Sequence, residues 1–95
     1  MIIRILTEGQ YRLEGEALSA LDRLDDQLLD ALAAGNREGY DSNFREVLAL
    51  VRGRGNRIPD TELVESDLIL PAPDTTFEEA RSLFADYPRE LSAGV

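Results

Sequence analysis

The sequence contains no cysteine and no histidine. It therefore cannot form a disulfide, and it lacks the side chains that build the common zinc sites. The same absence removes a cysteine nucleophile and any triad that depends on a histidine base. All ten basic side chains are arginines, so no lysine is present to activate a serine. We therefore expect no enzymatic activity, no metal ion and no cofactor.

Long apolar runs are also missing. No stretch approaches the roughly 18 apolar residues that a membrane-spanning helix requires. The first residues, Met1 to Arg4, lead quickly to Glu8 and lack the apolar stretch of a secretory signal peptide. These absences predict a cytoplasmic protein.

Positive charge is scarce. Nineteen acidic side chains against ten basic ones give a net charge of −9. Nucleic acids and anionic lipid headgroups are bound through lysine and arginine, so this surface should repel both. The composition therefore disfavours direct binding of DNA, RNA or a bilayer, and it leaves another protein as the expected partner.

The length of 95 residues suits one domain with one modest core. Residues 2–6 are rich in β-branched side chains, Gly9 suits a short loop, and residues 10–14 alternate apolar with polar. This pattern predicts an antiparallel hairpin. Its core-facing side chains would be Ile3, Ile5, Tyr11 and Leu13. Alternatively, residues 11–14 could lead straight into the next helix without pairing.

Residues 16–34 carry apolar side chains three and four apart, which predicts an amphipathic helix. Gly35 stands where a left-handed residue ends a helix, and Asn36 can cap a second one. The second helix would end around residues 52–55. Two helices joined by so short a connection must run antiparallel. Their seam would contain Leu21, Leu24, Leu28, Phe44, Val47, Leu48 and Val51.

The last third contains a loop over residues 56–66 and a short apolar strand over residues 67–70. Continuous apolar character predicts that both faces of this strand are covered, as in a central strand. Thr76 with Glu79, or Thr75 with Glu78, has capping-box spacing and starts a short helix. We therefore predict an α+β fold with an antiparallel sheet over residues 2–6, 10–14 and 67–70, packed on the helical hairpin and closed by a short C-terminal helix. The domain would span residues 1–86, with residues 87–95 as a flexible tail.

Three aspartates, Asp22, Asp26 and Asp30, lie four residues apart and share one face of the first helix, with Asp25 beside them. A magnesium or calcium site needs oxygen ligands that converge from several directions, and one helix face gives divergent ones. Two interpretations stay open for these four residues: a solvated helix face and a docking face for a basic partner.

A second candidate is the group Arg52, Arg54 and Arg57 in residues 36–57, the segment with five arginines and three acidic residues. Cations near the end of a helix compensate its dipole, which is a structural explanation. The functional alternative is a docking point for an acidic patch on a partner.

Three stretches in order carry a family resemblance. The first is Ile3-Arg4-Ile5 followed by Glu8-Gly9-Gln10-Tyr11-Arg12. The second runs from Leu21 to Asp26 with Leu28, and continues with Leu48 to Arg52 and Gly55. The third is Ser66 to Pro71 followed by Asp74 and Thr76 to Arg81. Together they resemble the PspA-associated domain family, PspAA.

This resemblance implies a non-catalytic adaptor or regulator of a PspA-like coiled-coil protein in the envelope stress response. The chain would then meet the inner membrane only through that partner. An acidic adaptor could dock on basic helical surface by charge complementarity.

Two alternatives belong to other classes. The first is an acidic regulator that binds and blocks a basic DNA-binding protein. The second is a structural homo-oligomerisation module, in which Ile2 and Leu6 form the contact because both point away from the predicted core face.

Overall fold

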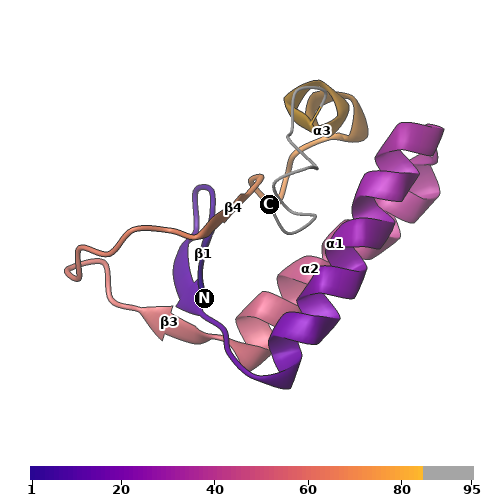
Figure 1. The fold of residues 1–95 in the computed structure, drawn as a ribbon. Coiled ribbons are helices and arrows are strands. Elements are labelled where there is room, and N and C mark those ends of the chain that lie inside the picture. Colours follow the sequence, from indigo (N-terminus) through magenta and orange to yellow (C-terminus); the bar gives the residue numbers. More distant parts are fainter. Residues whose placement is uncertain (85–95) are drawn as a thin grey trace.

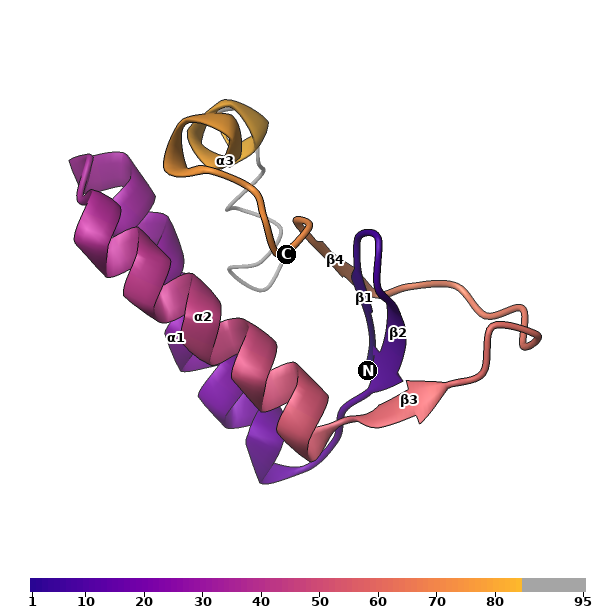
Figure 2. The ribbon, with the colours of Figure 1, turned by 180° about the vertical axis from the view of Figure 1, so that it is seen from behind.

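A computed structural model describes residues 1–84 of the chain, and it shows a sheet that faces a helical hairpin, with a short third helix beyond (Figure 1). The view from behind shows the same two layers (Figure 2). The α+β fold class is confirmed. The predicted tail, residues 87–95, lies outside the described residues, as do residues 85–86 of the predicted domain.

The sheet has four strands: β1 (Ile2–Ile5), β2 (Gly9–Arg12), β3 (Asn56–Ile58) and β4 (Leu68–Leu70). Their order in the sheet is β3-β2-β1-β4. The predicted hairpin is present, because β1 and β2 pair antiparallel with Ile3 opposite Tyr11. The alternative, in which residues 11–14 lead into the next helix without pairing, is wrong for Tyr11 and Arg12, because both belong to β2 and pair with β1.

The sheet is mixed, so the prediction of a wholly antiparallel sheet is wrong. Strand β4 runs parallel to β1, with Arg4 opposite Ile69. The reason is the connection between β3 and β4, which starts at one edge of the sheet and ends at the other. After this crossing the chain enters β4 next to β1, and β4 runs in the same direction as β1.

Two further predictions about the strands are corrected. The interpretation of residues 56–66 as a loop missed β3, which pairs with β2 through Arg57 opposite Tyr11. Three residues before a proline show too little alternation to be recognised. Strand β4 is an edge strand rather than a central one, and Ile69 on its outer side is 55% exposed.

The helical hairpin agrees with the prediction, with α1 at Glu16–Ala34 and α2 at Arg37–Arg54. Gly35 adopts the left-handed conformation at φ 71°, and its N–H and that of Asn36 bond to carbonyls of the last turn of α1. Asn36 Oδ1 accepts a hydrogen bond of 3.0 Å from the N–H of Gly39 and caps α2. The Gly35 helix end and the Asn36 cap both depend on residues within a few positions in the sequence, which is why the sequence predicts them.

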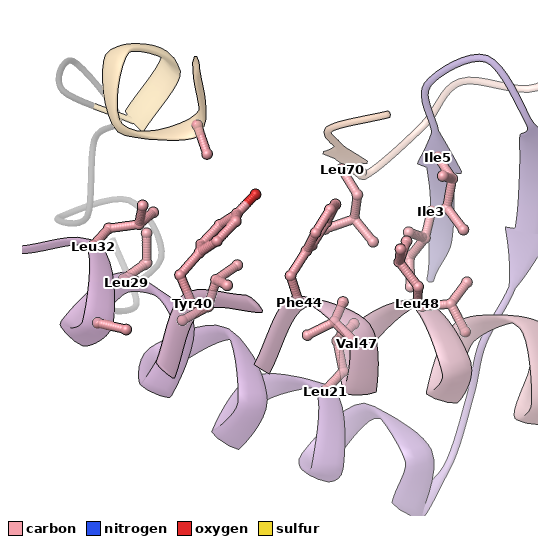
Figure 3. Close-up of a cluster of buried hydrophobic side chains, with 14 of the residues drawn as sticks. Ile3, Ile5, Leu21, Leu29, Leu32, Tyr40, Phe44, Val47, Leu48 and Leu70 are labelled. Carbon is pink, nitrogen blue, oxygen red and sulfur yellow. The ribbon is translucent and has the colours of Figure 1, made fainter. Parts of the chain in front are cut away.

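The core lies between the inner face of the sheet and the hairpin (Figure 3). From the sheet it receives Ile3, Ile5 and Leu70, while the predicted Tyr11 is half-buried beside it. The predicted helix seam is buried except at Leu24, which is only half-buried. The remaining seam residues in the core are Leu21, Leu28, Phe44, Val47, Leu48 and Val51.

The short helix α3 (Phe77–Phe84) begins with the predicted capping box, and the structure selects Thr76 with Glu79. Glu79 Oε1 accepts from the N–H of Thr76 at 3.0 Å, while Thr76 Oγ1 accepts from the N–H of Glu79 at 3.2 Å. Buried Phe77 and Ala80 attach α3 to the hairpin. An exposed ion pair between Arg37 and Glu78 adds to this contact.

The unequal burial of the seam residues predicts unequal costs of truncation. Phe44→Ala should lower the free energy of unfolding by roughly 3–5 kcal/mol, because the ring is buried and leaves a cavity. Leu24→Ala should cost less than about 2 kcal/mol, since water already reaches part of its side chain. Urea denaturation of both variants measures the two values, and equal losses would contradict this placement of the seam.

Tyr40 is an unusual member of the core. Its ring is 1% exposed, stacks on Phe44 at 5.4 Å between centroids and meets Phe77 edge-on at 5.8 Å. Its hydroxyl has no hydrogen-bond partner within the described part of the chain. Burial raises the pKa of Tyr40 to about 12. An unpaired buried hydroxyl costs roughly 1–3 kcal/mol.

Tyr40→Phe should therefore leave the free energy of unfolding unchanged or raise it by about 1 kcal/mol, because it keeps the ring and removes the unpaired hydroxyl. Tyr40→Ala is the matched control and should destabilise by about 3–5 kcal/mol through the lost ring contacts. Thermal and urea unfolding measure both. A clear loss of stability in Tyr40→Phe would mean that the hydroxyl is hydrogen-bonded in solution.

Candidate partner-binding surfaces

The acidic row of α1 consists of Asp22, Asp26 and Asp30, and all three side chains are exposed. Buried leucines of α1, among them Leu21 and Leu28, occupy the opposite side of the helix. Residues four apart lie above one another on a helix, so the three carboxylates follow one line about 12 Å long. The structure therefore presents this row to the outside of the domain.

Asp25 does not belong to this row, although the sequence placed it beside the other three. It is half-buried. Four residues separate it from Leu21 on one side and from Leu29 on the other, and both leucines are buried. Helical periodicity therefore puts Asp25 at the border of the apolar side of α1.

Arg52, in the last turn of α2, is engaged within the molecule. Its Nε donates to both carboxylate oxygens of Glu8, at 2.9 and 3.1 Å, and its Nη2 donates to Oε1 at 2.5 Å. The Tyr11 hydroxyl donates to the same carboxylate at 3.0 Å. The Arg52 guanidinium holds the pKa of Glu8 below its ordinary value, and the Tyr11 hydroxyl lowers it further. This contact joins the hairpin loop of the sheet to the end of α2.

Arg57 is engaged as well. Its Nη2 donates to the backbone carbonyl of Glu8 at 3.0 Å and to Asp60 at 3.0 Å, and its guanidinium lies over the Tyr11 ring. Gly9, with φ 139°, passes so close to this guanidinium that a Cβ there would collide with it. Arg54 alone of the three predicted arginines is exposed without an ion pair in the described region.

The strongest link that sequence reasoning missed is the side chain of Gln10. It is 6% exposed, and its Nε2 donates to the carbonyl of Val64 at 3.0 Å and to Ser66 Oγ at 2.9 Å. Nearby, Asp67 Oδ2 accepts from the N–H of Ile2 at 2.7 Å. The first and third stretches of the family resemblance therefore meet in space. No local rule connects residues more than fifty positions apart.

Residues 1–84 also bear on metal binding and on membrane insertion. Within that range, no group of three acidic side chains is arranged to hold a metal ion. In the same range, no helix combines the length and the apolar character needed to cross a membrane. The acidic row of α1 and the arginines near the end of α2 are charged surfaces that a partner could recognise.

The fold and these surfaces define a small acidic α+β domain whose aspartate row faces outward, while Arg52 fastens the β1–β2 loop to α2 and Arg57 fastens the same loop to β3. A family model described as PspA-Associated protein, PspAA, matches residues 1–90, and the chain belongs to this family. The predicted family membership is thereby confirmed, and the family description connects such chains with PspA-type proteins. No match was found among curated proteins or among solved structures.

The Glu8–Arg52 pair leads to a prediction about pH. Glu8→Gln keeps a hydrogen-bond acceptor and removes the charge, so it should lower the free energy of unfolding at pH 7 by at most about 1 kcal/mol, the range of partly exposed pairs. Because folding lowers the pKa of Glu8, its contribution is complete above the ordinary value of 4.5 and is lost as the pH falls through the folded value. Wild type and variant should therefore converge when the pH is lowered from 7 to a value below the folded pKa of Glu8.

Urea denaturation at the two pH values measures this effect. Glu14→Gln, which neutralises an exposed glutamate after β2, is the control and should show no such difference. A gap between wild type and Glu8→Gln that stays constant with pH would show that the charge of Glu8 contributes nothing.

Proposed function

We propose that this chain is a non-catalytic adaptor or regulator that binds a PspA-type coiled-coil protein and modulates the envelope stress response. The observation that carries the proposal is the family match, which extends over residues 1–90 and so includes every described element. The acidic row of α1 is the surface that we assign to the contact. The chain would act in the cytoplasm and reach the inner membrane only through its partner.

The geometry of the acidic row favours a helical partner. Its carboxylates are about 6 Å apart along α1, the rise of four helical residues, so a helix lying alongside could oppose them with lysine or arginine at the same spacing. The alternative surface is formed by Arg52, Arg54 and Arg57. Two of these three guanidinium groups already bind Glu8 or Asp60.

The charge of the row suggests how such an adaptor would act. Electrostatic complementarity mainly accelerates encounter and selects partners, and it is screened over about 8 Å at physiological salt. Basic side chains of the partner that face this row cannot bind anionic lipid at the same time. Competition between the acidic row and lipid headgroups is therefore the regulatory step that we propose.

Reversal of the row tests the proposal. Asp22→Arg, Asp26→Arg and Asp30→Arg together should slow association with a purified PspA-type protein by at least tenfold at low salt, and the difference should shrink as salt is added. Stopped-flow or biolayer measurements over a salt series give the rates. Circular dichroism should show an unchanged fold, because the three side chains are exposed.

The matched control reverses Glu14, Glu46 and Asp74, three exposed acidic residues outside α1, and changes the net charge by the same amount. It should slow association much less. Arg54→Glu tests the arginine surface without breaking the contacts of Glu8. If the aspartate variant associates like wild type while Arg54→Glu does not, the contact belongs to the arginine surface instead.

A further inference from the structure

Leu63 is the most exposed of the large apolar side chains in the described region. It is 97% exposed, compared with 55% for Ile69 and 41% for Leu6. It lies in the connection between β3 and β4, residues 59–67, which extends beyond the sheet on the side away from the helical hairpin (Figure 1). Single exposed leucines are common on protein surfaces. What distinguishes Leu63 is the set of contacts that holds it in solvent.

The connection is fastened to the sheet on both sides of Leu63. Before it, Asp60 pairs with Arg57 at 3.0 Å, and the N–H of Glu62 donates to the carbonyl of Pro59 at 3.0 Å. After it, the carbonyl of Val64 accepts from Gln10 Nε2 at 3.0 Å. Leu63 therefore stands between two fixed points, and its position in solvent is set by the fold.

Ile58 and Gln10 show what the rest of the connection does. The two lie opposite each other in the β2–β3 register and share the outer face of the sheet, since the neighbouring Tyr11 faces the hairpin. Ile58 is buried there, outside the main core. The connection thus buries Ile58 and Gln10 while it leaves Leu63 outside. A solvated leucine adds nothing to the stability of the isolated domain.

The charges around Leu63 indicate what could receive it. Asp60, Glu62 and Glu65 flank it, all are exposed, and no basic residue lies among them. An anionic lipid surface would repel this segment, whereas an apolar pocket with a basic rim would complement both the leucine and its flanks. Apolar anchors that are held in position before binding lose little conformational freedom on binding.

We propose that Leu63 is an anchor that inserts into an apolar pocket, rimmed by basic side chains, on the PspA-type partner. This inference rests on the proposed function and adds a second contact to it. The acidic row belongs to α1 in the helical layer, whereas Leu63 belongs to the connection that extends from the sheet on the side away from the helices (Figures 1 and 2). We therefore expect the two contacts to engage different segments of the partner.

Substitution of Leu63 tests this proposal with the full chain and a purified PspA-type protein at fixed salt. Leu63→Ala and Leu63→Glu should each weaken binding at least tenfold, and Leu63→Met, which keeps the volume, should bind within about twofold of wild type. Ile69→Ala, an exposed apolar residue off the loop, is the control and should leave the affinity unchanged. Calorimetry measures the affinities, and the unfolding curves of the Leu63 variants should match wild type.

The outcomes separate this inference from the proposed function. If Leu63→Glu binds like wild type while reversal of the acidic row weakens binding, the proposed Leu63 contact is wrong and the proposed adaptor function is supported. If the wild-type chain does not bind the partner at all, both the Leu63 contact and the adaptor function are refuted.

Two other occupants of the Leu63 site have their own tests. Vesicles of anionic phospholipid that bind wild type but not Leu63→Glu would assign the loop to lipid and overturn the proposal. A wild-type dimer in light scattering that Leu63→Glu dissolves would assign the loop to a second copy of the chain and also overturn it.

Discussion

The sheet has two faces, and the helical hairpin covers only one of them. The inner face places Ile3, Ile5 and Leu70 against the hairpin and forms the main core. The outer face still carries a large apolar side chain, Ile58, which needs cover from water, and a polar one, Gln10, whose buried amide needs hydrogen-bond partners. The connection between β3 and β4 supplies that cover, and much of the architecture follows from this requirement.

The Gln10 amide shows how the cover is secured. A buried amide that lacks partners is costly, and here both hydrogens of Nε2 have acceptors on the connection, Val64 and Ser66. The same crossing delivers β4 to the far edge of the sheet, parallel to β1. It also holds Leu63 in solvent. The Gln10 side chain thus holds the connection that covers the outer face, leads to β4 and carries Leu63.

The charged residues divide into two groups with different roles. Glu8, Arg52 and Arg57 form a network with Tyr11 that fastens the hairpin loop and β3 to the end of α2. The acidic row of α1 faces away from the core. A protein with a net charge of −9 therefore uses Arg52 and Arg57, as well as Arg37 beside α3, for internal cohesion and presents the aspartates of the acidic row outward, which suits recognition of a basic partner. Bridging two partner elements would make binding of the second contact effectively intramolecular.

Local chemistry by itself determined the helical elements. The apolar spacing of residues 16–34, the left-handed Gly35, the Asn36 cap and the Thr76–Glu79 capping box each act within a few residues. The helices could therefore be predicted from the sequence, with the bounds of α1 correct and the capping box narrowed to two pairs. The acidic row could be predicted for the same reason, since helical periodicity alone places Asp22, Asp26 and Asp30 on one face. That periodicity also moves Asp25 to the border of the apolar side.

Only the tertiary structure decided the rest. Strand β3, the edge position and parallel direction of β4, and the contacts of Gln10 and Glu8 depend on partners 44 to 65 residues away in sequence. A short strand such as β3 has no pattern of its own and exists because β2 offers it a free edge. The exposure of Leu63 is likewise invisible in a sequence that places it beside Val64, because burial is decided by which chain segments cover a site and not by the hydrophobicity of the residue.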